Sequence, residues 1–420
     1  MVAKMREMKD SGIEWVGEIP DGWYTMANKY VMGKIKHINP LYNGEDILSL
    51  TMNGVIVRDL DAGGKMPSSF DGYQTLYPGN LLMCLFDYNV TPRCIGLIRN
   101  HGVTSPAYSQ FKMNPGYSAH YYYYYYLMVD HTKALLHRAK NLRHSFTEDQ
   151  LGAIAVPVPP VKEQRAIAAF LDAKCSEIDA LSADIQSEID TLEAYKRSKV
   201  FDAVSHGVKN TAFKETDSDV WSSIPHGWKL VDIKYLFEIV KRIAGKEGYD
   251  ILAITQQGLK IKDISSNEGQ LASDYSGYQF VYPGDYAMNH MDLLTGWVDL
   301  SDKFGVTSPD YRVFRLRDTE HFDRKYYMYI MQCCYMCRIF YSLGQGVSNL
   351  GRWRLQTSAF NNFKVPVPPY EEQVEIGKHL DEAIGDINTI ISQKQEQLAV
   401  LADYKKSVIY EYVTGKKEVV

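Results

Sequence analysis

The feature that most constrains this chain is an internal repeat. The turn Ile-Pro-x-Gly-Trp at 19–23 returns at 224–228, an offset of 205 residues (228 − 23). The run Val-Pro-Val-Pro-Pro at 156–160 returns at 365–369, an offset of 209 (365 − 156). The other repeated landmarks are Tyr-Pro-Gly at 77–79 and 282–284 and Gly-Val-Thr-Ser-Pro at 102–106 and 305–309. Landmarks that recur in one order indicate duplicated structural units, so we expect two copies of one unit.

The two copies are not equally similar along their length. Residues 157–204 and 366–413 match in frame, whereas 23–156 and 228–365 share landmarks and differ at most other positions. Each unit is therefore predicted to be a variable globular part followed by a similar helical part. The predicted domains are a globular part at 1–156, a helical part at 157–209, a second globular part at 210–365 and a second helical part at 366–420.

A seven-residue apolar repeat follows each Pro-Pro pair and predicts two long helices. Proline is tolerated at a helix start, and a sustained seven-residue spacing is typical of a coiled-coil seam. A helix of roughly 40 residues would be about 60 Å long. Lys394 interrupts the second repeat. The predicted seam consists of Leu171, Ile178, Ile185, Ile189 and Leu192 in the first helix and Leu380, Ile384, Ile387, Ile391, Leu398 and Leu401 in the second.

Each long helix has a single apolar stripe and therefore needs a partner. The other helix of the same chain is the obvious one, and a two-fold relation between the copies makes the pair antiparallel. The alternative is that each helix covers its own globular part, but such helices usually show a broader apolar face with a 3.6-residue period.

The globular parts contain short β-type segments separated by turns. Helices are predicted at 120–129 and 324–339. The tyrosine run 121–126 is either a stacking platform for bases or an aromatic core helix, and the mixed run at 326–330 favours the core helix. The predicted strands lie at 45–50, 54–59, 80–86 and 93–99 in the first copy and at 250–255, 258–263, 285–289 and 311–316 in the second. The expected fold class is α+β, with two pseudo-symmetric globular α/β domains joined by two long helices that form an antiparallel coiled coil.

Composition excludes several classes of protein. The six cysteines form no regular framework, and Cys334-x-x-Cys337 lacks the second ligand pair that structural zinc needs, so we expect free thiols and no metal site. The polar N-terminal residues and the lack of a long apolar stretch predict a cytoplasmic protein with no membrane contact. The formal net charge of −5 means that any DNA-binding surface must come from a local cluster of cations.

No enzyme motif is complete. Pro368-Pro369-Tyr370 resembles a base-holding methyltransferase loop, but Val367 stands where that loop needs a polar residue. No phosphate-binding Gly-rich loop with Lys and Ser or Thr is present. Asp310, Asp323 and Lys325 have a spacing that suits a nuclease, although Asp323 opens a predicted helix, where a capping aspartate is ordinary. A nuclease is therefore the weakest alternative, and the chain is predicted to be non-catalytic.

Polar and basic loop positions that differ between the copies are the candidates for contact with DNA. Arginine suits two-point hydrogen bonding to guanine, and asparagine or glutamine suits adenine. The candidates are His37, Lys65, Arg93, Arg99, Arg143 and His144 in the first copy and Lys241, Arg242, Lys246, Lys260, Lys262, Gln345, Asn349, Arg352 and Arg354 in the second.

Several motifs together resemble the specificity subunits of type I restriction–modification systems. They are Trp15-x-x-x-Ile19-Pro20-x-Gly22-Trp23, the run Val-Pro-x-Pro-Pro-x-x-Glu-Gln that ends at Gln164 and again at Gln373, and Val413-Thr414-Gly415-Lys416. The resemblance covers essentially the whole chain. The first copy departs from it slightly, because it reads Val204-Ser205-His206-Gly207 at the end of its helix.

The resemblance implies two target recognition domains that each read one half of a bipartite, asymmetric DNA sequence. It also implies a coiled coil that sets the gap between the half-sites. The implied partners are double-stranded DNA, two methyltransferase subunits and, in some systems, two restriction subunits. S-adenosylmethionine, ATP and Mg²⁺ would then be bound by those partners and no cofactor by this chain. The competing hypothesis is a coiled-coil adaptor that binds proteins and not DNA, which the near-neutral charge favours slightly.

Overall fold

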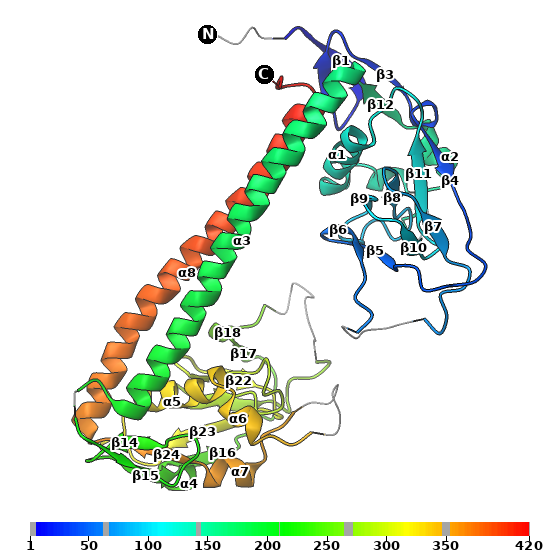
Figure 1. Cartoon of the computed structure of the whole chain (residues 1–420). Coiled ribbons are helices and arrows are strands. Elements are labelled where there is room, and N and C mark those ends of the chain that lie inside the picture. The colour runs from blue at the N-terminus through cyan, green and yellow to red at the C-terminus, as the bar shows by residue number, and fades with distance from the viewer. Residues whose placement is uncertain are drawn as a thin grey trace. The chain divides into compact units, whose positions relative to one another are not determined.

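The computed structural model describes residues 6–61, 67–139, 144–209, 211–263, 272–346 and 353–419. The chain divides into two compact units (Figure 1). Unit 1 comprises Met1–Ile185 together with Glu396–Val420, and unit 2 comprises Gln186–Gln395. Each unit therefore contains one globular part and a segment of each long helix.

The globular part of unit 1 is built from short antiparallel strands. Its largest sheet has the order β4-β11-β8-β9, from β4 (Met32–Ile35), β11 (Ser109–Met113), β8 (Leu81–Met83) and β9 (Ile95–Leu97). The two-stranded pairs are β1 (Met8–Ile13) with β2 (Gly17–Pro20), β3 (Tyr24–Ala27) with β12 (Ala155–Val158), β5 (Leu48–Thr51) with β6 (Gly54–Val57), and β7 (Gln74–Leu76) with β10 (Gly102–Thr104). The helical elements are η1 (Asn28–Tyr30), α1 (Ala119–His131), η2 (Leu136–Arg138) and α2 (Glu148–Ala153).

Unit 2 repeats this topology strand for strand. Its largest sheet has the order β16-β23-β20-β21, from β16 (Phe237–Val240), β23 (Arg312–Leu316), β20 (Tyr286–Met288) and β21 (Val298–Leu300). The two-stranded pairs are β13 (Phe213–Glu215) with β14 (Ser223–Pro225), β15 (Lys229–Asp232) with β24 (Lys364–Val367), β17 (Leu252–Thr255) with β18 (Gly258–Ile261), and β19 (Gln279–Val281) with β22 (Gly305–Thr307). The short helices are α4 (Ile233–Leu236), α5 (Arg324–Met336), α6 (Ile339–Ser342) and α7 (Thr357–Asn362). The pseudo-symmetric α+β architecture predicted from the repeat is confirmed.

The tyrosine run forms the core helix α1. Tyr121, Tyr122 and Tyr125 are fully buried, so their faces are not available for stacking on bases. Buried tyrosines contribute large apolar areas, and their hydroxyl groups usually find hydrogen-bond partners. α5 has the same role in unit 2, and Asp323 caps it by accepting a hydrogen bond from the Tyr326 N–H at 2.8 Å.

The two long helices are α3 (Val161–His206) and α8 (Tyr370–Val413). In unit 1, the ring centroids of Phe170 and Tyr412 lie 4.3 Å apart, and Lys405 Nζ lies 2.6 Å from Asp179 Oδ1. In unit 2, Lys394 pairs with Glu188, and Lys196 Nζ donates to Asn388 Oδ1 at 2.7 Å. Since rising numbers in α3 meet falling numbers in α8 within each unit, the segments pack antiparallel, as predicted. The interruption at Lys394 is explained by its ion pair with Glu188.

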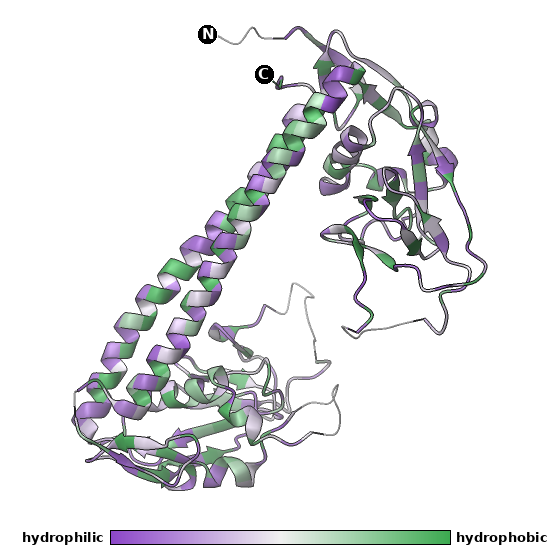
Figure 2. Ribbon diagram, in the orientation of Figure 1, coloured by the Kyte–Doolittle hydropathy of each residue, from purple (hydrophilic) through white to green (hydrophobic). Residues whose placement is uncertain are grey.

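The apolar positions of both helices lie along their contact line. Figure 2 shows apolar and polar residues alternating along α3 and α8. The seam positions Leu171, Ile178, Ile185, Ile189, Leu380, Ile384, Ile387 and Ile391 are buried, and Leu192, Leu398 and Leu401 are half-buried. Among the described residues, no helix combines the length and apolar character needed to cross a bilayer.

Candidate nucleic-acid interface

The same tryptophan–glutamate pair fixes each globular part to the start of a long helix. Trp23 Nε1 donates to Glu163 Oε2 at 2.9 Å, and Trp228 Nε1 donates to Glu372 Oε2 at 2.9 Å. Both indole rings are 1% exposed. A buried indole N–H needs a partner, so the pairing explains why the Gly-Trp turn and the Glu-Gln motif recur together.

The neighbouring glutamine joins the core helix to the same point. Gln164 Oε1 accepts from the Ser118 N–H at 2.8 Å, and its Nε2 donates to the Pro159 carbonyl at 2.9 Å. Gln373 repeats both bonds, accepting from the Asp323 N–H at 2.8 Å and donating to the Pro368 carbonyl at 2.9 Å. Each glutamine therefore satisfies a helix-terminal N–H that would otherwise be unpaired.

One aspartate of each long helix completes the attachment. Asp172 Oδ1 accepts from the Tyr124 hydroxyl at 2.8 Å, and Asp381 Oδ1 accepts from the Tyr329 hydroxyl at 2.9 Å. Asp381 also pairs with Lys325, so this lysine holds α5 to α8. We call Trp23, Glu163, Gln164 and Asp172, with their counterparts Trp228, Glu372, Gln373 and Asp381, the shared anchor.

The end of the other long helix also reaches each core helix. The Tyr121 hydroxyl donates to the Val413 carbonyl at 2.8 Å in unit 1. In unit 2 the Tyr326 hydroxyl donates to the Val204 carbonyl at 3.3 Å. Both carbonyls belong to last helical turns, where the backbone lacks intrahelical donors. Each globular part is thus held by one helix start and one helix end.

Away from the shared anchor, each unit has a tyrosine flanked by other rings or cations, half-buried in unit 1 and exposed in unit 2. In unit 1, His37 Nδ1 lies 2.8 Å from the Tyr77 hydroxyl oxygen. The ring centroid of Tyr77 lies 5.4 Å from that of His37 and 5.7 Å from that of His101. Both histidines are exposed. This row therefore offers imidazole and phenol groups to solvent.

In unit 2 the position that corresponds to His37 carries an arginine, Arg242. The Arg242 guanidinium carbon lies 4.7 Å from the Tyr282 ring centroid, and the rings of Tyr282 and Phe304 lie 5.1 Å apart. Tyr282 and Phe304 are 41% and 43% exposed. Lys246 extends the row, 5.7 Å from the Tyr249 ring. We call His37, Tyr77 and His101, and in unit 2 Arg242, Tyr282 and Phe304, the tyrosine edge.

The tyrosine edge has chemistry that suits nucleic acid. Exposed aromatic faces can stack on bases, and guanidinium or imidazolium groups can contact phosphates or base edges. Sequence reasoning named His37, Arg242 and Lys246 but missed Tyr77 and Tyr282. The repeated Tyr-Pro-Gly motif could have identified these two tyrosines. They lie 205 positions apart (282 − 77), and the candidates His37 and Arg242 have the same separation (242 − 37).

The candidates Gln345 and Arg354 of unit 2 lie in one of three loop segments that hydrogen bonds connect. Gln256 Nε2, in the β17–β18 turn, donates to the Thr295 carbonyl at 3.4 Å, and the Leu293 N–H donates to the Trp353 carbonyl at 3.1 Å. Backbone hydrogen bonds of 2.9 and 3.1 Å pair Gln345 with Arg354. The remaining described candidates of unit 2, on or near β16 and β18, are Lys241, Lys260 and Lys262.

Arg93 supports a hairpin in unit 1 with most of its donors. Its Nε donates to the Ile95 carbonyl at 3.1 Å, and its terminal nitrogens bond the Met52 carbonyl and the Tyr123 hydroxyl. Arginine has five N–H donors in a rigid fork, so little capacity is left for bidentate contact with a base. Positive charge at this position is visible in the sequence, but the internal use of its donors is not.

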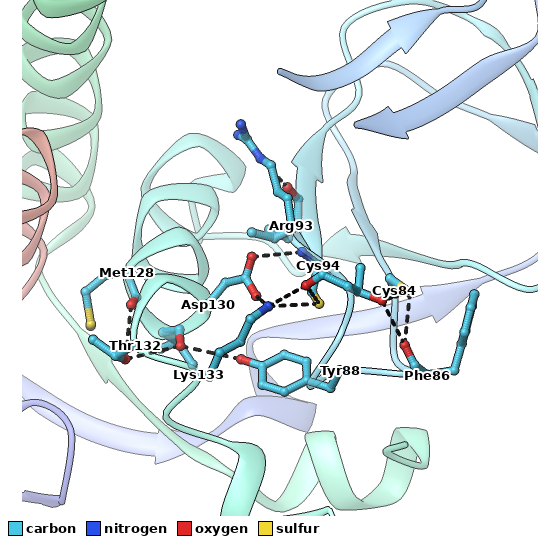
Figure 3. A network of polar contacts seen from close by, with 12 residues as sticks. Cys84, Phe86, Tyr88, Arg93, Cys94, Met128, Asp130, Thr132 and Lys133 are labelled. Atoms are coloured by element: carbon cyan, nitrogen blue, oxygen red, sulfur yellow. Dashed lines mark hydrogen bonds and ion pairs between the residues drawn. The ribbon is translucent and has the colours of Figure 1, made fainter. Parts of the chain in front are cut away.

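A buried carboxylate holds the loop that carries Arg93 (Figure 3). Asp130 Oδ2 accepts from the Cys94 N–H at 2.8 Å, and Asp130 Oδ1 lies 2.6 Å from Lys133 Nζ. The same ammonium donates to the Thr91 carbonyl at 2.7 Å. In Figure 3 the Arg93 side chain points away from this network. Asp130 and Lys133 therefore hold the loop on the side away from the Arg93 side chain.

The other candidates of unit 1 are placed separately. Arg99 is exposed just after β9. His144 has a positive φ of 43°, and within the described residues its buried Nδ1 has no hydrogen-bond partner. Lys65, Arg143, Asn349 and Arg352 lie outside the described residues.

Unit 2 contains a large groove beside its helix segments. Its volume is about 1400 Å³, and α3, α5, α8 and the β17–β18 turn contribute to its walls. The charged residues of its lining are Glu193, Lys196, Arg197, Asp299 and Arg338. Three cations and two acids give this lining a small positive excess.

Comparison with known proteins finds a family model that matches part of the chain. Residues 225–400 match the type I restriction modification DNA specificity domain. This segment is therefore similar to the DNA specificity domain of type I restriction–modification systems. The family match begins beside the second Gly-Trp turn and includes the Glu-Gln motif of α8, so it contains the whole shared anchor of unit 2.

Curated members of the specificity-subunit family align with much of the chain. The type I restriction enzyme MjaVIII specificity subunit of Methanocaldococcus jannaschii is 24% identical over 283 residues, 63% of this chain and 62% of that protein. A putative MjaX specificity subunit of the same organism is 24% identical over 301 residues, 68% of this chain and 64% of that protein. The aligned region thus spans slightly less than two thirds of each relative.

The fold also matches a solved chain described as "Structural basis underlying complex assembly and conformational transition of the type I R-M system". The TM-score is 0.65 with 15% sequence identity, and the match covers 95% of this chain and 99% of that one. At this identity the likeness concerns the fold, and it extends over both units.

Proposed function

We propose that this chain selects the DNA sequence on which partner methyltransferase subunits act, with each globular part contacting one half of a bipartite, asymmetric target. The observation that carries the proposal is the contrast between a matching shared anchor and a divergent tyrosine edge. Equivalent positions present His37 and His101 in one unit and Arg242 and Phe304 in the other. Different donors and ring faces on one scaffold favour different half-sites.

The long helices have the spacing role in this proposal. Two recognition modules joined by a rigid element can bind only half-sites that lie a fixed number of base pairs apart. The parts that match between the copies, 157–204 and 366–413, are also the natural surfaces for docking two copies of one methyltransferase. Restriction subunits would join the same assembly in systems that cleave DNA.

No catalytic step is assigned to this chain. Asp323 caps α5 and Lys325 pairs with Asp381, so two of the three residues of the nuclease alternative have structural roles. S-adenosylmethionine would serve the methyltransferase subunits, and ATP with Mg²⁺ would serve restriction subunits.

A domain exchange tests the proposal. Residues 25–155 are replaced by the matching segment of another specificity subunit, the chain is combined with its methyltransferase partner, and methylated sites are read by sequencing. We expect one half of the methylated sequence to change while the other half and the gap stay the same. The matched control is the exchange of residues 230–364, which should change the other half only.

Two outcomes would contradict the proposal. Methylation of an unchanged sequence after either exchange would show that the globular parts do not select DNA. Complex formation with the partner but no effect of this chain on where methylation occurs would support the adaptor hypothesis.

A further inference from the structure

One pair of thiols stands apart from the other cysteines. All six cysteines are free, and five are buried, whereas Cys337 is partly exposed and lines the groove of unit 2. The Sγ atoms of Cys333 and Cys337 lie 3.8 Å apart. The spacing Cys334-x-x-Cys337 matches half of a zinc site. Among the described residues, no group of three or more His, Cys, Asp or Glu side chains is arranged to hold a metal ion.

The surroundings of Cys337 favour its thiolate. The hydrogen bond from Cys333, together with the nearby Arg197 guanidinium, lowers the pKa of Cys337 below its ordinary value. Burial raises the pKa of Cys334 well above its ordinary value, and it also raises the pKa of Cys94. The thiolate is the reacting form of cysteine, so the accessible thiol is also the activated one.

We propose that Cys337 and Cys333 form a peroxide-oxidisable dithiol in unit 2, with Cys337 as the attacking thiol and Cys333 as the resolving thiol. The Cys337 sulfur attacks one oxygen of hydrogen peroxide, so an S–O bond forms, the O–O bond breaks and hydroxide leaves as water after taking a proton. The Cys333 sulfur then attacks the sulfenic sulfur, so an S–S bond forms, the S–O bond breaks and a second water leaves. Two electrons pass from the two sulfurs to the peroxide.

The geometry permits this second step at the end of a helix. Side chains four residues apart on a helix have Cβ atoms about 5–6 Å apart, whereas a disulfide needs about 3.5–4.5 Å. The last turn of α5 must therefore tighten. Cys337 is the C-terminal cap of α5, and Arg338 follows it with a left-handed φ of 54°, so the helix already ends here. Movement at this point does not break an interior helical turn.

Unit 1 has no equivalent dithiol. With the offset of 205 between the core helices, Met128 and Thr132 occupy the places of Cys333 and Cys337 (333 − 205 = 128, 337 − 205 = 132). Cys84 and Cys94 of unit 1 are both buried, so they serve as internal controls. The proposal is independent of DNA reading, since it concerns only thiol chemistry.

Peptide mass spectrometry of the full chain tests the proposal. The reduced protein is treated with a small excess of hydrogen peroxide, remaining thiols are alkylated, and tryptic peptides are fragmented. We expect loss of two hydrogens within the α5 peptide, with the link between Cys333 and Cys337, while Cys84, Cys94 and Cys175 remain alkylatable after unfolding. This measurement needs no variant, so it does not depend on whether a substituted chain folds.

Three substitutions assign the roles. Cys337→Ser should abolish the oxidation, and Cys333→Ser should leave a sulfenic acid on Cys337 that a 1,3-dione traps. Cys334→Ser is the matched control and should behave like the unchanged chain. Oxidation spread evenly over the six cysteines, or a link that uses Cys334, would overturn the proposal.

The part played by Arg197 can be measured separately. Arg197→Gln should slow alkylation of Cys337 by a factor of roughly 3 to 10, because a rise of one pKa unit reduces the thiolate fraction about tenfold at neutral pH. Arg315→Gln removes another exposed arginine of unit 2 and should leave the rate unchanged. An equal rate in both variants would overturn activation by Arg197.

Discussion

At the tyrosine edge, the backbone N–H groups of the equivalent tyrosines Tyr77 and Tyr282 have different acceptors. The acceptor is an amide side chain in unit 1 and a carboxylate in unit 2. In unit 1 the neutral side chain of Gln110 accepts from the Tyr77 N–H at 2.9 Å and from Asn80 Nδ2 at 3.1 Å. In unit 2 the carboxylate of Asp285 accepts from the Tyr282 N–H at 2.8 Å and pairs with Arg242. The position of the tyrosine is thus kept while the charge beside it changes.

The shared anchor shows the opposite behaviour. Its tryptophan–glutamate bonds are both 2.9 Å, and its glutamine bonds agree within the two units at 2.8 and 2.9 Å. A scaffold that must meet two helix starts with the same Glu-Gln motif has little freedom in these contacts. A surface that contacts different ligands can vary, provided that the backbone beneath it stays in place.

The largest expected effect tests whether the two anchors are equivalent. Trp23→Ala and Trp228→Ala should each destabilise their own unit by about 3–5 kcal/mol, since each removes a buried ring and the indole donor to Oε2 of Glu163 or Glu372. Hydrogen exchange followed separately in each unit measures this loss. A loss below about 1 kcal/mol in only one unit would break the equivalence of the anchors.

A smaller effect tests the difference at the tyrosine edge. Asp285→Ala should destabilise unit 2 by about 1–3 kcal/mol, because it leaves Arg242 and the Tyr282 N–H without their acceptor. Asn80→Ala should cost unit 1 only about 0.5–1.5 kcal/mol, because Gln110 still accepts from the Tyr77 N–H. Denaturant unfolding compares the two. Arg315→Gln breaks an exposed pair and should cost under about 1 kcal/mol.

If Asp285→Ala and Asn80→Ala lowered the free energy of unfolding by the same amount, the ion pair between Arg242 and Asp285 would have no special role in unit 2. A loss from Arg315→Gln as large as that from Asp285→Ala would also contradict the comparison, because burial distinguishes the two pairs. Asp285 has a side chain that is 5% exposed, whereas that of Glu238, the partner of Arg315, is 42% exposed.

The smallest effect concerns pH and His290 in unit 2. Burial, followed by repulsion from Arg312 and Arg354, lowers the pKa of His290 to about 4. The unfolded chain binds this proton below about pH 6.5, so stability from neutral His290 is present above that pH and is lost as pH falls toward 4. His290→Gln should make the stability of unit 2 less dependent on pH in this window, by at most about 1 kcal/mol per pH unit. An identical pH slope in both chains would contradict the assignment.

The repeat and the apolar spacing were enough to predict the architecture. The helix stripe around Leu171 and Leu380 depends only on local periodicity, and the core position of Tyr121 followed from comparing the two copies. These features are set by short-range sequence patterns, which a sequence displays directly. The predicted DNA-contacting residues remain predictions, apart from the internal roles found for some of them.

The site was harder to predict because it depends on long-range neighbours. The sequence shows that Arg93 is charged, but the use of its donors by Met52 and Tyr123 appears only in the fold. Tyr77 and Tyr282 belong to the candidate site because their rings lie beside rings that are distant in the sequence, such as those of His101 and Phe304. The sequence also does not show which thiols are neighbours, and the fold places the Cys333 sulfur 3.8 Å from that of Cys337.

Unit 1 consists of two segments that are distant in the sequence, and this affects the order in which the two units can fold during synthesis. Unit 2 is a continuous stretch, Gln186–Gln395, whereas the core of unit 1 needs Val408, Ile409 and Val413 from the far end of the chain. At roughly 5–20 residues per second, synthesis of the 210 intervening residues (395 − 185) takes about 10–40 s. The unit that is made first therefore stays incomplete until the C-terminal part of α8 has been made. A premature stop in the last turns of α8 would damage the first-made unit and leave the second-made one intact.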